Sequence, residues 1–189
     1  MTIPILSTKT HIPPIRENIL SRSGVLAYLD TKAGAKLTLV SAPAGYGKTT
    51  LLSQWTQHAK NAIAWVSLDE SDNDLSRFLT YLVAALQETN PSLGETSQDV
   101  LLSSPQIQVK SVLIPLLNDI QNTISQNIFL VLDDYHVIDE QVVHQAVDFL
   151  LEYAPTQLHI VIASRSTPPL ALSKLRARRQ MSELRAEDL

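Results

Sequence analysis

One segment constrains the fold of this chain more than any other: an apolar strand runs directly into a glycine-containing loop, which opens an amphipathic helix. The strand is Leu37 to Val40, the loop is Ala42 to Thr49, and the helix carries Leu51, Leu52 and Trp55. Small loop residues let backbone N–H groups curl around phosphate oxygens, and a helix N-terminus adds partial positive charge. This order therefore predicts a phosphate-binding loop of the P-loop type.

The loop matches the pattern G-x-x-x-x-G-K-[ST] except at its first position, where Ala42 replaces glycine. This departure matters only if that residue needs a positive φ. The pattern assigns Lys48 to the β- and γ-phosphates and the Thr49 hydroxyl to Mg²⁺. The other nucleotide contacts predicted in the loop are Pro43, Ala44, Gly45, Tyr46, Gly47 and Thr50. The alternative is a chance Gly-Lys-Thr turn before a helix, and the rest of the chain must decide between them.

A second apolar strand, Ile128 to Leu132, ends in the two carboxylates Asp133 and Asp134. Ligands bind at the carboxyl ends of strands in open α/β sheets. We therefore predict that Asp133 holds Mg²⁺ through water and that Asp134 orients or polarises an attacking water. The alternative is a pair of solvated loop acids, and the phosphate loop upstream favours the magnesium site.

A third run, Ile160 to Ala163, ends in Ser164 and Arg165. A guanidinium group matches phosphate geometry with two parallel hydrogen bonds, so Arg165 is predicted to reach the γ-phosphate. A surface arginine is the alternative. The five histidines of the chain never pair at metal-ligand spacing, which disfavours a histidine metal site.

Four apolar, β-branched runs alternate with helical patterns, which is typical of βαβ units. The runs are 37–40, 63–68, 128–132 and 160–163. The predicted fold is α/β: a P-loop NTPase three-layer α/β/α sandwich with a mostly parallel sheet of about five strands.

The segments outside these runs carry weaker expectations. Residues 69–74 are acidic and are expected to form a solvated strand-to-helix connection, while 90–108 are rich in Ser, Pro and Gly and are expected to form a surface loop. The basic tail 170–189 is expected to be the charged face of a packed element. It ends without a Gly, a Pro or a polar stretch of the kind that closes a domain, so we expect the natural chain to continue.

Two units are expected along the chain. Residues 1–30 are expected to form an N-terminal arm and a short helix, because Pro4, Pro13 and Pro14 deny the arm a helix and the helical pattern starts near Glu17. An arm of this kind usually covers part of the domain, and the family resemblance described below implies that it covers the nucleotide site. Residues 31–189 form the nucleotide-binding domain.

Composition excludes several classes of function. A formal charge of −4 gives no whole-molecule attraction to nucleic acid or acidic lipid, and the absence of cysteine rules out disulfides and thiolate metal sites. No apolar stretch approaches the length of a membrane helix. We expect a cytoplasmic protein without a membrane partner.

Together these motifs resemble the ATPase module of MalT-like, large LuxR-type transcription regulators, members of the STAND class of signalling P-loop ATPases. The residues that carry the resemblance are Ile12-Pro13-Pro14, Ser41 to Thr50, Ala64 to Asp69, Asp72 to Asp74, Arg77-Phe78, Leu132 to His136 and Ala163 to Arg165.

The resemblance implies further roles. The arm from Ile12 to Arg22 would help enclose adenine, which adds Ile12 and Arg22 to the predicted nucleotide contacts. Arg165 would take the sensor-one role, on a strand between those of the phosphate loop and Asp133. The resemblance also implies ATP or ADP with Mg²⁺, an ADP-bound resting state, and self-association of the full-length protein with ATP and an inducer.

In that family, hydrolysis would be slow and would reset the switch. DNA would be bound only through a C-terminal helix-turn-helix, which this sequence does not contain; nor does it contain the family's winged-helix and repeat sensor domains. A second hypothesis is a free-standing P-loop kinase or phosphotransferase acting on a small acceptor. A kinase should add an arginine-rich lid over the phosphates, whereas the paired Asp133 and Asp134 suit water activation better.

Overall fold

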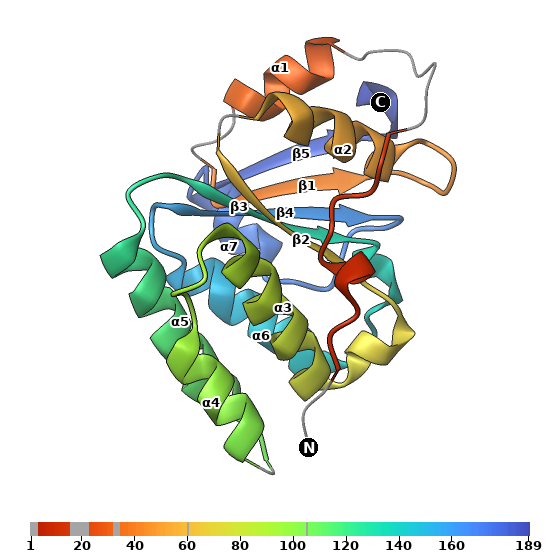
Figure 1. The fold of residues 1–189 in the computed structure, drawn as a ribbon. Helices are drawn as coiled ribbons and strands as arrows, with labels where there is room; N and C mark the ends of the chain where they lie inside the picture. The colour runs from red at the N-terminus through yellow and green to blue at the C-terminus, as the bar shows by residue number, and fades with distance from the viewer. Residues whose placement is uncertain (1–3, 16–22, 32–34, 60, 105) are drawn as a thin grey trace.

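The computed structural model of the protein describes residues 4–15, 23–31, 35–59, 61–104 and 106–189. Within these ranges five strands form one parallel sheet in the order β2-β3-β4-β1-β5 (Figure 1). The strands are β1 Leu37–Ser41, β2 Ala62–Ser67, β3 Ile128–Asp133, β4 Leu158–Ser164 and β5 Met181–Arg185. The predicted α/β architecture is confirmed, as is the place of β4 between β1 and β3.

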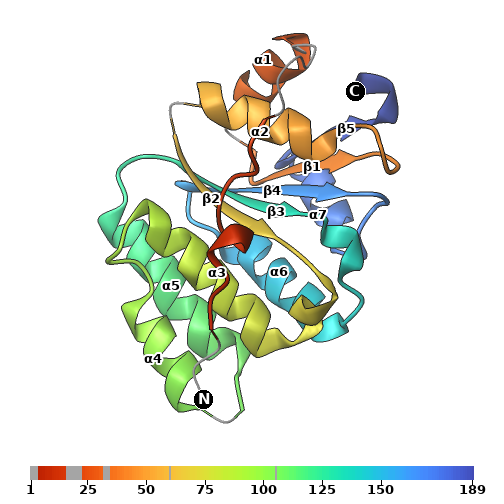
Figure 2. The same cartoon turned by 45° about the vertical axis from the view of Figure 1, so that its right-hand side comes forward.

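Helices cover both faces of the sheet and make the three layers (Figures 1 and 2). One face carries α1 and α2; the other carries α3, α5 and α6, with α4 outside them. The bounds are α1 Ser23–Thr31, α2 Lys48–His58, α3 Leu75–Thr89, α4 Glu95–Ser103, α5 Val109–Thr123, α6 Gln141–Tyr153 and α7 Leu172–Ala177. None of the described helices is both long and apolar enough to cross a bilayer.

The strands divide their side chains between two cores because successive residues of a strand point to opposite faces. In β3, Ile128, Leu130 and Leu132 pack with α3, α5 and α6, while Phe129 and Val131 pack with α1 and α2. Burial on both faces explains why these strands read as continuous apolar runs in the sequence. It also leaves only the strand ends available for chemistry.

The expectation that residues 90–108 form a surface loop was wrong, because helix α4 occupies the centre of this segment. Gly94 precedes α4 with φ 71°, and its N–H donates to Asp119 Oδ2 of α5 at 3.0 Å. Ser97 is fully buried, and its hydroxyl donates to the carbonyl of Val112 at 2.7 Å. Hydrogen bonds to α5 hold this polar segment in a helix, and composition alone does not reveal them.

The basic tail contains a strand that the sequence reading did not locate. β5 pairs with β1 at the edge of the sheet, and only alternate residues, Ser182 and Leu184, are buried. The expected packing of the tail's apolar side is confirmed, since Leu172 and Leu175 of α7 are also buried. An edge strand with one solvated face lacks the continuous apolar run that marks the other four.

The N-terminal arm, residues 4–15, is extended apart from one 3-10 turn, η1 Ser7–Lys9. It runs beside β2 and α3 towards the side of the molecule that carries α2 (Figures 1 and 2). The short helix expected after the arm corresponds to α1, which runs from Ser23 to Thr31. Residues 16–22, where that helix was expected to begin, lie outside the described residues.

Candidate functional site

The loop between β1 and α2 depends on two glycines. Gly45 has φ 85° and Gly47 has φ 76°, a left-handed region that glycine adopts without strain. A Cβ on Gly45 would meet nothing within 4 Å, so the backbone conformation, not space, calls for glycine there. Ala42 is not among the residues with positive φ. Its departure from the loop pattern therefore costs nothing.

Lys48, the first residue of α2, folds back over the start of the loop. Its ammonium group donates to the carbonyls of Ala42 at 2.8 Å and Pro43 at 3.1 Å. The side chain is buried, and burial lowers the pKa of Lys48 despite the nearby carboxylates of Asp134 and Asp133. No ion pair joins Lys48 to a carboxylate of the described residues. A buried cation that, in the described part of the chain, has carbonyls as its hydrogen-bond partners is placed to receive an anion.

Asp133 ends β3 beneath the loop and is 2% exposed. Burial raises its pKa to about 6, although a hydrogen bond from the Thr49 side chain opposes that rise. Its Oδ1 also accepts the N–H of Asp134 at 3.0 Å. The predicted pair of magnesium-binding groups, a hydroxyl and a carboxylate from different elements, thus lies within hydrogen-bonding distance.

Asp134 and Arg165 share an open pocket with the phosphate loop. The pocket has a volume of about 420 Å³, and its walls are Pro14, Ala44, Gly45, Gly47, Lys48, Thr49, Thr50, Asp134 and Arg165. Asp134 has φ 57°, and its side chain is half exposed. An aspartate tolerates this left-handed backbone better than most residues do, and here it leaves the carboxylate at the pocket wall.

Some predicted contacts do not line this pocket. Tyr46 and Ile12 are exposed at 44% and 41% and stand outside its walls. Pro43 contributes a carbonyl to Lys48 instead of a wall, and Arg22 lies outside the described residues. Pro14, which lies in the arm expected to enclose adenine but was not predicted as an individual contact, lines the pocket in their place. Its signals in the sequence were its position in a proline-rich arm and the role that the family resemblance implies for that arm.

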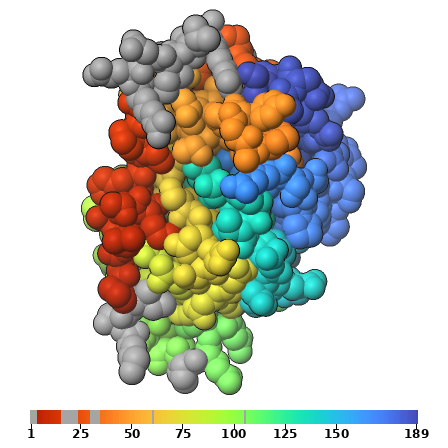
Figure 3. All heavy atoms as spheres, turned by 90° about the vertical axis from the view of Figure 1, so that its right-hand side faces the viewer, coloured from red at the N-terminus to blue at the C-terminus, as the bar shows by residue number. Residues whose placement is uncertain are grey.

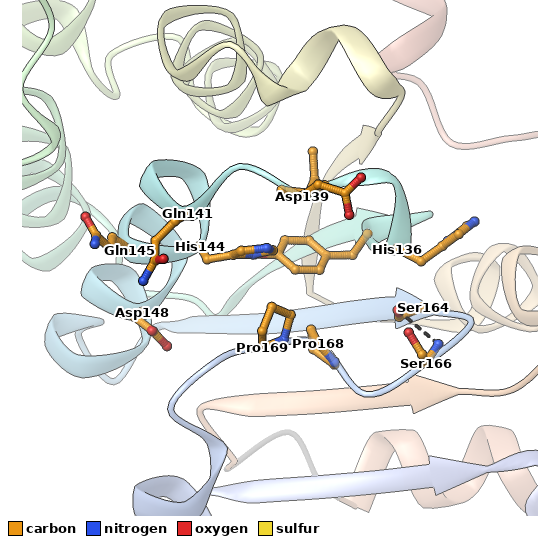
Figure 4. Close-up of a pocket in the computed structure, with 12 residues that line it drawn as sticks. His136, Asp139, Gln141, His144, Gln145, Asp148, Ser164, Ser166, Pro168 and Pro169 are labelled. Atoms are coloured by element: carbon orange, nitrogen blue, oxygen red, sulfur yellow. Dashed lines mark hydrogen bonds between the residues drawn. The ribbon is translucent and has the colours of Figure 1, made fainter.

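A second, polar pocket of about 340 Å³ lies between α6 and the chain after β4 (Figure 4). The Tyr135 hydroxyl and His144 Nδ1 are 2.9 Å apart in its wall, where Ser164 also lies. His136 lines this second pocket, and its buried Nδ1 lies 3.8 Å from Oδ1 of Asp134, a residue of the first pocket. This Nδ1 has no hydrogen-bond partner among the described residues. Burial, and after it the charge of Arg165, lowers the pKa of His136.

The groups present fit a magnesium nucleotide. The glycines hold an open cradle, the first N–H groups of α2 have no acceptor within the helix, and Lys48 has no anionic partner among the described residues. The Thr49 and Asp133 oxygens suit Mg²⁺, which prefers hard oxygen ligands. A phosphate loop and a carboxylate strand end in one parallel sheet define a P-loop nucleotide-binding domain.

The family described as AAA ATPase domain matches residues 14–163. The chain belongs to this family. It is 37% identical over 185 residues to the HTH-type transcriptional regulator MalT of Serratia proteamaculans and 36% identical to that of Yersinia pestis. Each alignment covers 98% of this chain and 20% of the relative, so the chain spans about a fifth of their length. The predicted resemblance to MalT-like ATPase modules is confirmed.

Solved structures show the same fold. A STAND protein with a tetratricopeptide repeat sensor from Pyrococcus horikoshii superposes with a TM-score of 0.58 at 15% identity, covering 97% of this chain and 25% of that one. Cdc6p from Pyrobaculum aerophilum gives 0.55 at 14% identity, covering 95% and 49%. At these identities the likeness supports the fold alone.

Proposed function

We propose that this chain is an ATP- and ADP-binding switch module of a signal-responsive transcription regulator, with slow Mg²⁺-dependent hydrolysis that resets the switch. The observation that carries the proposal is Lys48, a buried ammonium held by two carbonyls at the wall of an open pocket. Such a group is expensive to keep in a fold unless an anion completes its environment. The similarity to MalT regulators supports the regulatory setting.

The residues around the pocket supply different parts of the chemistry. Lys48 and the first N–H groups of α2 bind phosphate oxygens, and Thr49 and Asp133 hold Mg²⁺, which offsets phosphate charge when bound. Arg165 reaches the γ-phosphate end. Asp134 presents a half-exposed carboxylate at the pocket wall and orients a water. Self-association with ATP and DNA binding belong, in this proposal, to the longer regulator.

The direct test removes the Lys48 cation. A charge-assisted hydrogen bond contributes roughly 1.5–3 kcal/mol, so Lys48→Ala should weaken Mg-ATP and Mg-ADP binding about tenfold or more in a calorimetric titration. Lys110→Ala, which removes an exposed lysine of α5, is the matched control and should bind as the wild type does. Identical titration curves for folded Lys48→Ala and wild type would contradict the proposal.

One observation favours a second function, transfer of the γ-phosphate to a small acceptor. The polar pocket in Figure 4 opens beside Ser164 and His136, next to the residues proposed to face the γ-phosphate. Steady-state phosphate release separates the two functions. A regulatory ATPase releases phosphate at the same slow rate with or without added acceptors, whereas a phosphotransferase releases less phosphate as the acceptor captures it.

A further inference from the structure

The N-terminal arm is fixed by a buried cation, Lys9, which is 6% exposed. Its ammonium group forms ion pairs with Asp72 and, at 2.9 Å, with Asp69 Oδ2, and it lies 4.6 Å from the centre of the Tyr81 ring. Asp72 is fully buried and also accepts from Arg77 Nε at 3.2 Å. The acidic segment expected to be solvated therefore contains a buried charge network.

Two further hydrogen bonds hold the same stretch of arm against α3. The N–H of Leu6 donates to the Tyr81 hydroxyl at 3.1 Å, and the Thr10 hydroxyl donates to Glu88. Figure 3 shows the arm lying along the segment that contains β2 and η2, Glu70–Asn73. We call these contacts of residues 6–10 the arm anchor.

The other end of the arm reaches the nucleotide site. Pro14 follows Lys9 by five residues, at most about 18 Å of chain, and it lines the phosphate-loop pocket. Proline restricts its own φ and favours extended backbone in the residue before it. Because Pro13 and Pro14 stand together, this link is stiff. The position of Pro14 therefore depends on whether the anchor is formed.

We propose that Lys9 is a positioning residue for the nucleotide site: its burial beside Asp72 docks the arm, and the docked arm places Pro14 as a wall of the pocket. This rests on the proposed nucleotide binding and extends it to a residue that does not line the phosphate-loop pocket. Docking of the arm and binding of nucleotide are then thermodynamically coupled, and each strengthens the other by the same factor.

The reciprocal effect is measurable in the wild-type protein. Hydrogen exchange followed by mass spectrometry reports on the arm, because the N–H groups of Lys9 and Thr10 donate to the carbonyls of Leu6 and Ser7 within it. Saturating Mg-ADP or Mg-ATP should slow exchange in peptides covering residues 4–15. Unchanged exchange in the arm at saturating nucleotide would overturn the coupling.

The variant test is Lys9→Met, with Lys110→Met on the exposed face of α5 as the matched control. When the docked fraction falls below about one tenth, the apparent Kd for Mg-ADP rises about tenfold. For Lys9→Met we expect this rise in Kd together with fast hydrogen exchange in the arm. For Lys110→Met we expect the wild-type Kd and wild-type exchange. Tyr81→Phe removes only the hydroxyl that accepts from Leu6, and it should give a smaller shift in both readouts if Lys9→Met does not fold.

The outcomes separate this inference from the proposed function. A wild-type protein that binds neither nucleotide rejects the nucleotide site and the inference together. Wild-type binding with an unchanged Kd in folded Lys9→Met, despite a rapidly exchanging arm, rejects the positioning role alone. Slow arm exchange in Lys9→Met rejects the anchor itself.

Discussion

The molecule buries two lysine and aspartate sets in opposite ways. In the arm anchor, Lys9 and Asp72 form a direct ion pair, and Arg77 and the backbone N–H of Asp69 complete the partners of the carboxylate. In the nucleotide site, Lys48 and Asp133 are buried to a similar degree but do not pair; the lysine holds carbonyls, and burial raises the pKa of the carboxyl to about 6.

This difference separates a structural network from a binding site. A buried charge that is fully partnered inside the fold has nothing to gain from a ligand, and its removal harms the fold. A buried charge left with weak partners destabilises the protein by itself. Binding of a ligand of opposite charge offsets that destabilisation. Substitutions in the two sets test that contrast, with expected effects that fall from about 3 kcal/mol to less than about 1 kcal/mol.

Breaking the anchor should cost stability. Lys9→Met leaves Asp72 with Arg77 as its one cationic partner. We expect the free energy of unfolding to fall by about 3 kcal/mol, the lower end for a broken buried pair, because detachment of the arm lets some water reach Asp72. Lys48→Met should cost less than about 1 kcal/mol, because removal of a buried charge offsets the loss of its two hydrogen bonds to carbonyls. Urea denaturation measures both, and equal losses would remove the distinction between the two sites.

Asp133→Asn should stabilise the protein in the absence of nucleotide. The difference between a folded pKa of about 6 and the ordinary 3.8 is about 2 pH units at roughly 1.4 kcal/mol each, or about 3 kcal/mol. Because the pKa of Asp133 is higher in the folded than in the unfolded protein, its protonated carboxyl contributes stability that is fully present below pH 3.8. That contribution is lost as the pH rises through about 6. The gain should therefore appear at pH 7 and vanish near pH 4.

The matched control for that gain is Asp134→Asn, which neutralises a half-exposed neighbour and should change the free energy of unfolding by less than about 0.5 kcal/mol. Denaturation at pH 4, 5.5 and 7 follows the dependence. A pH-independent difference between wild type and Asp133→Asn would contradict the buried-carboxyl account.

The two adjacent aspartates should also differ in chemistry. Asp134→Asn keeps a side chain that tolerates the left-handed backbone and should spare Mg-ATP binding while slowing phosphate release about tenfold or more. Asp133→Asn should instead weaken the Mg²⁺ dependence of binding. Titration at several Mg²⁺ concentrations and steady-state phosphate release measure both, and identical defects would refute the division of roles.

The smallest effect is expected at the exposed side of the anchor. The Asp69 side chain is 52% exposed, so Asp69→Asn should cost less than about 1 kcal/mol despite the 2.9 Å contact with Lys9. Burial acts to raise the pKa of Asp69, but hydrogen bonds from Lys9 and Ser71 outweigh it and lower the pKa. The small stabilising contribution of Asp69 is thus present at pH 7 and lost as the pH falls below 3.8. If Asp69→Asn lowered the free energy of unfolding as much as Lys9→Met does, the stability of the anchor would not depend on burial.

The sequence by itself determined the layered α/β fold, four of its strands and the loop that carries Lys48 and Thr49. These features follow from local rules: strands buried on both faces must be continuously apolar, and a tight loop before a helix needs glycine where φ is positive, as at Gly45 and Gly47. Sequence order also placed Asp133 and Arg165 at strand ends, and parallel pairing brings those ends to one edge.

Only the tertiary structure decided which charges are paired. Lys9 and Asp72 are 63 residues apart, and nothing in the acidic run 69–74 distinguishes the one fully buried carboxylate from its solvated neighbours. Strand β5 was missed because its charged residues alternate with buried ones, and helix α4 because its bonds to α5 are non-local. Burial depends on what packs against a residue from elsewhere in the chain, so side chains of the same type can become an anchor in one place and a binding site in another.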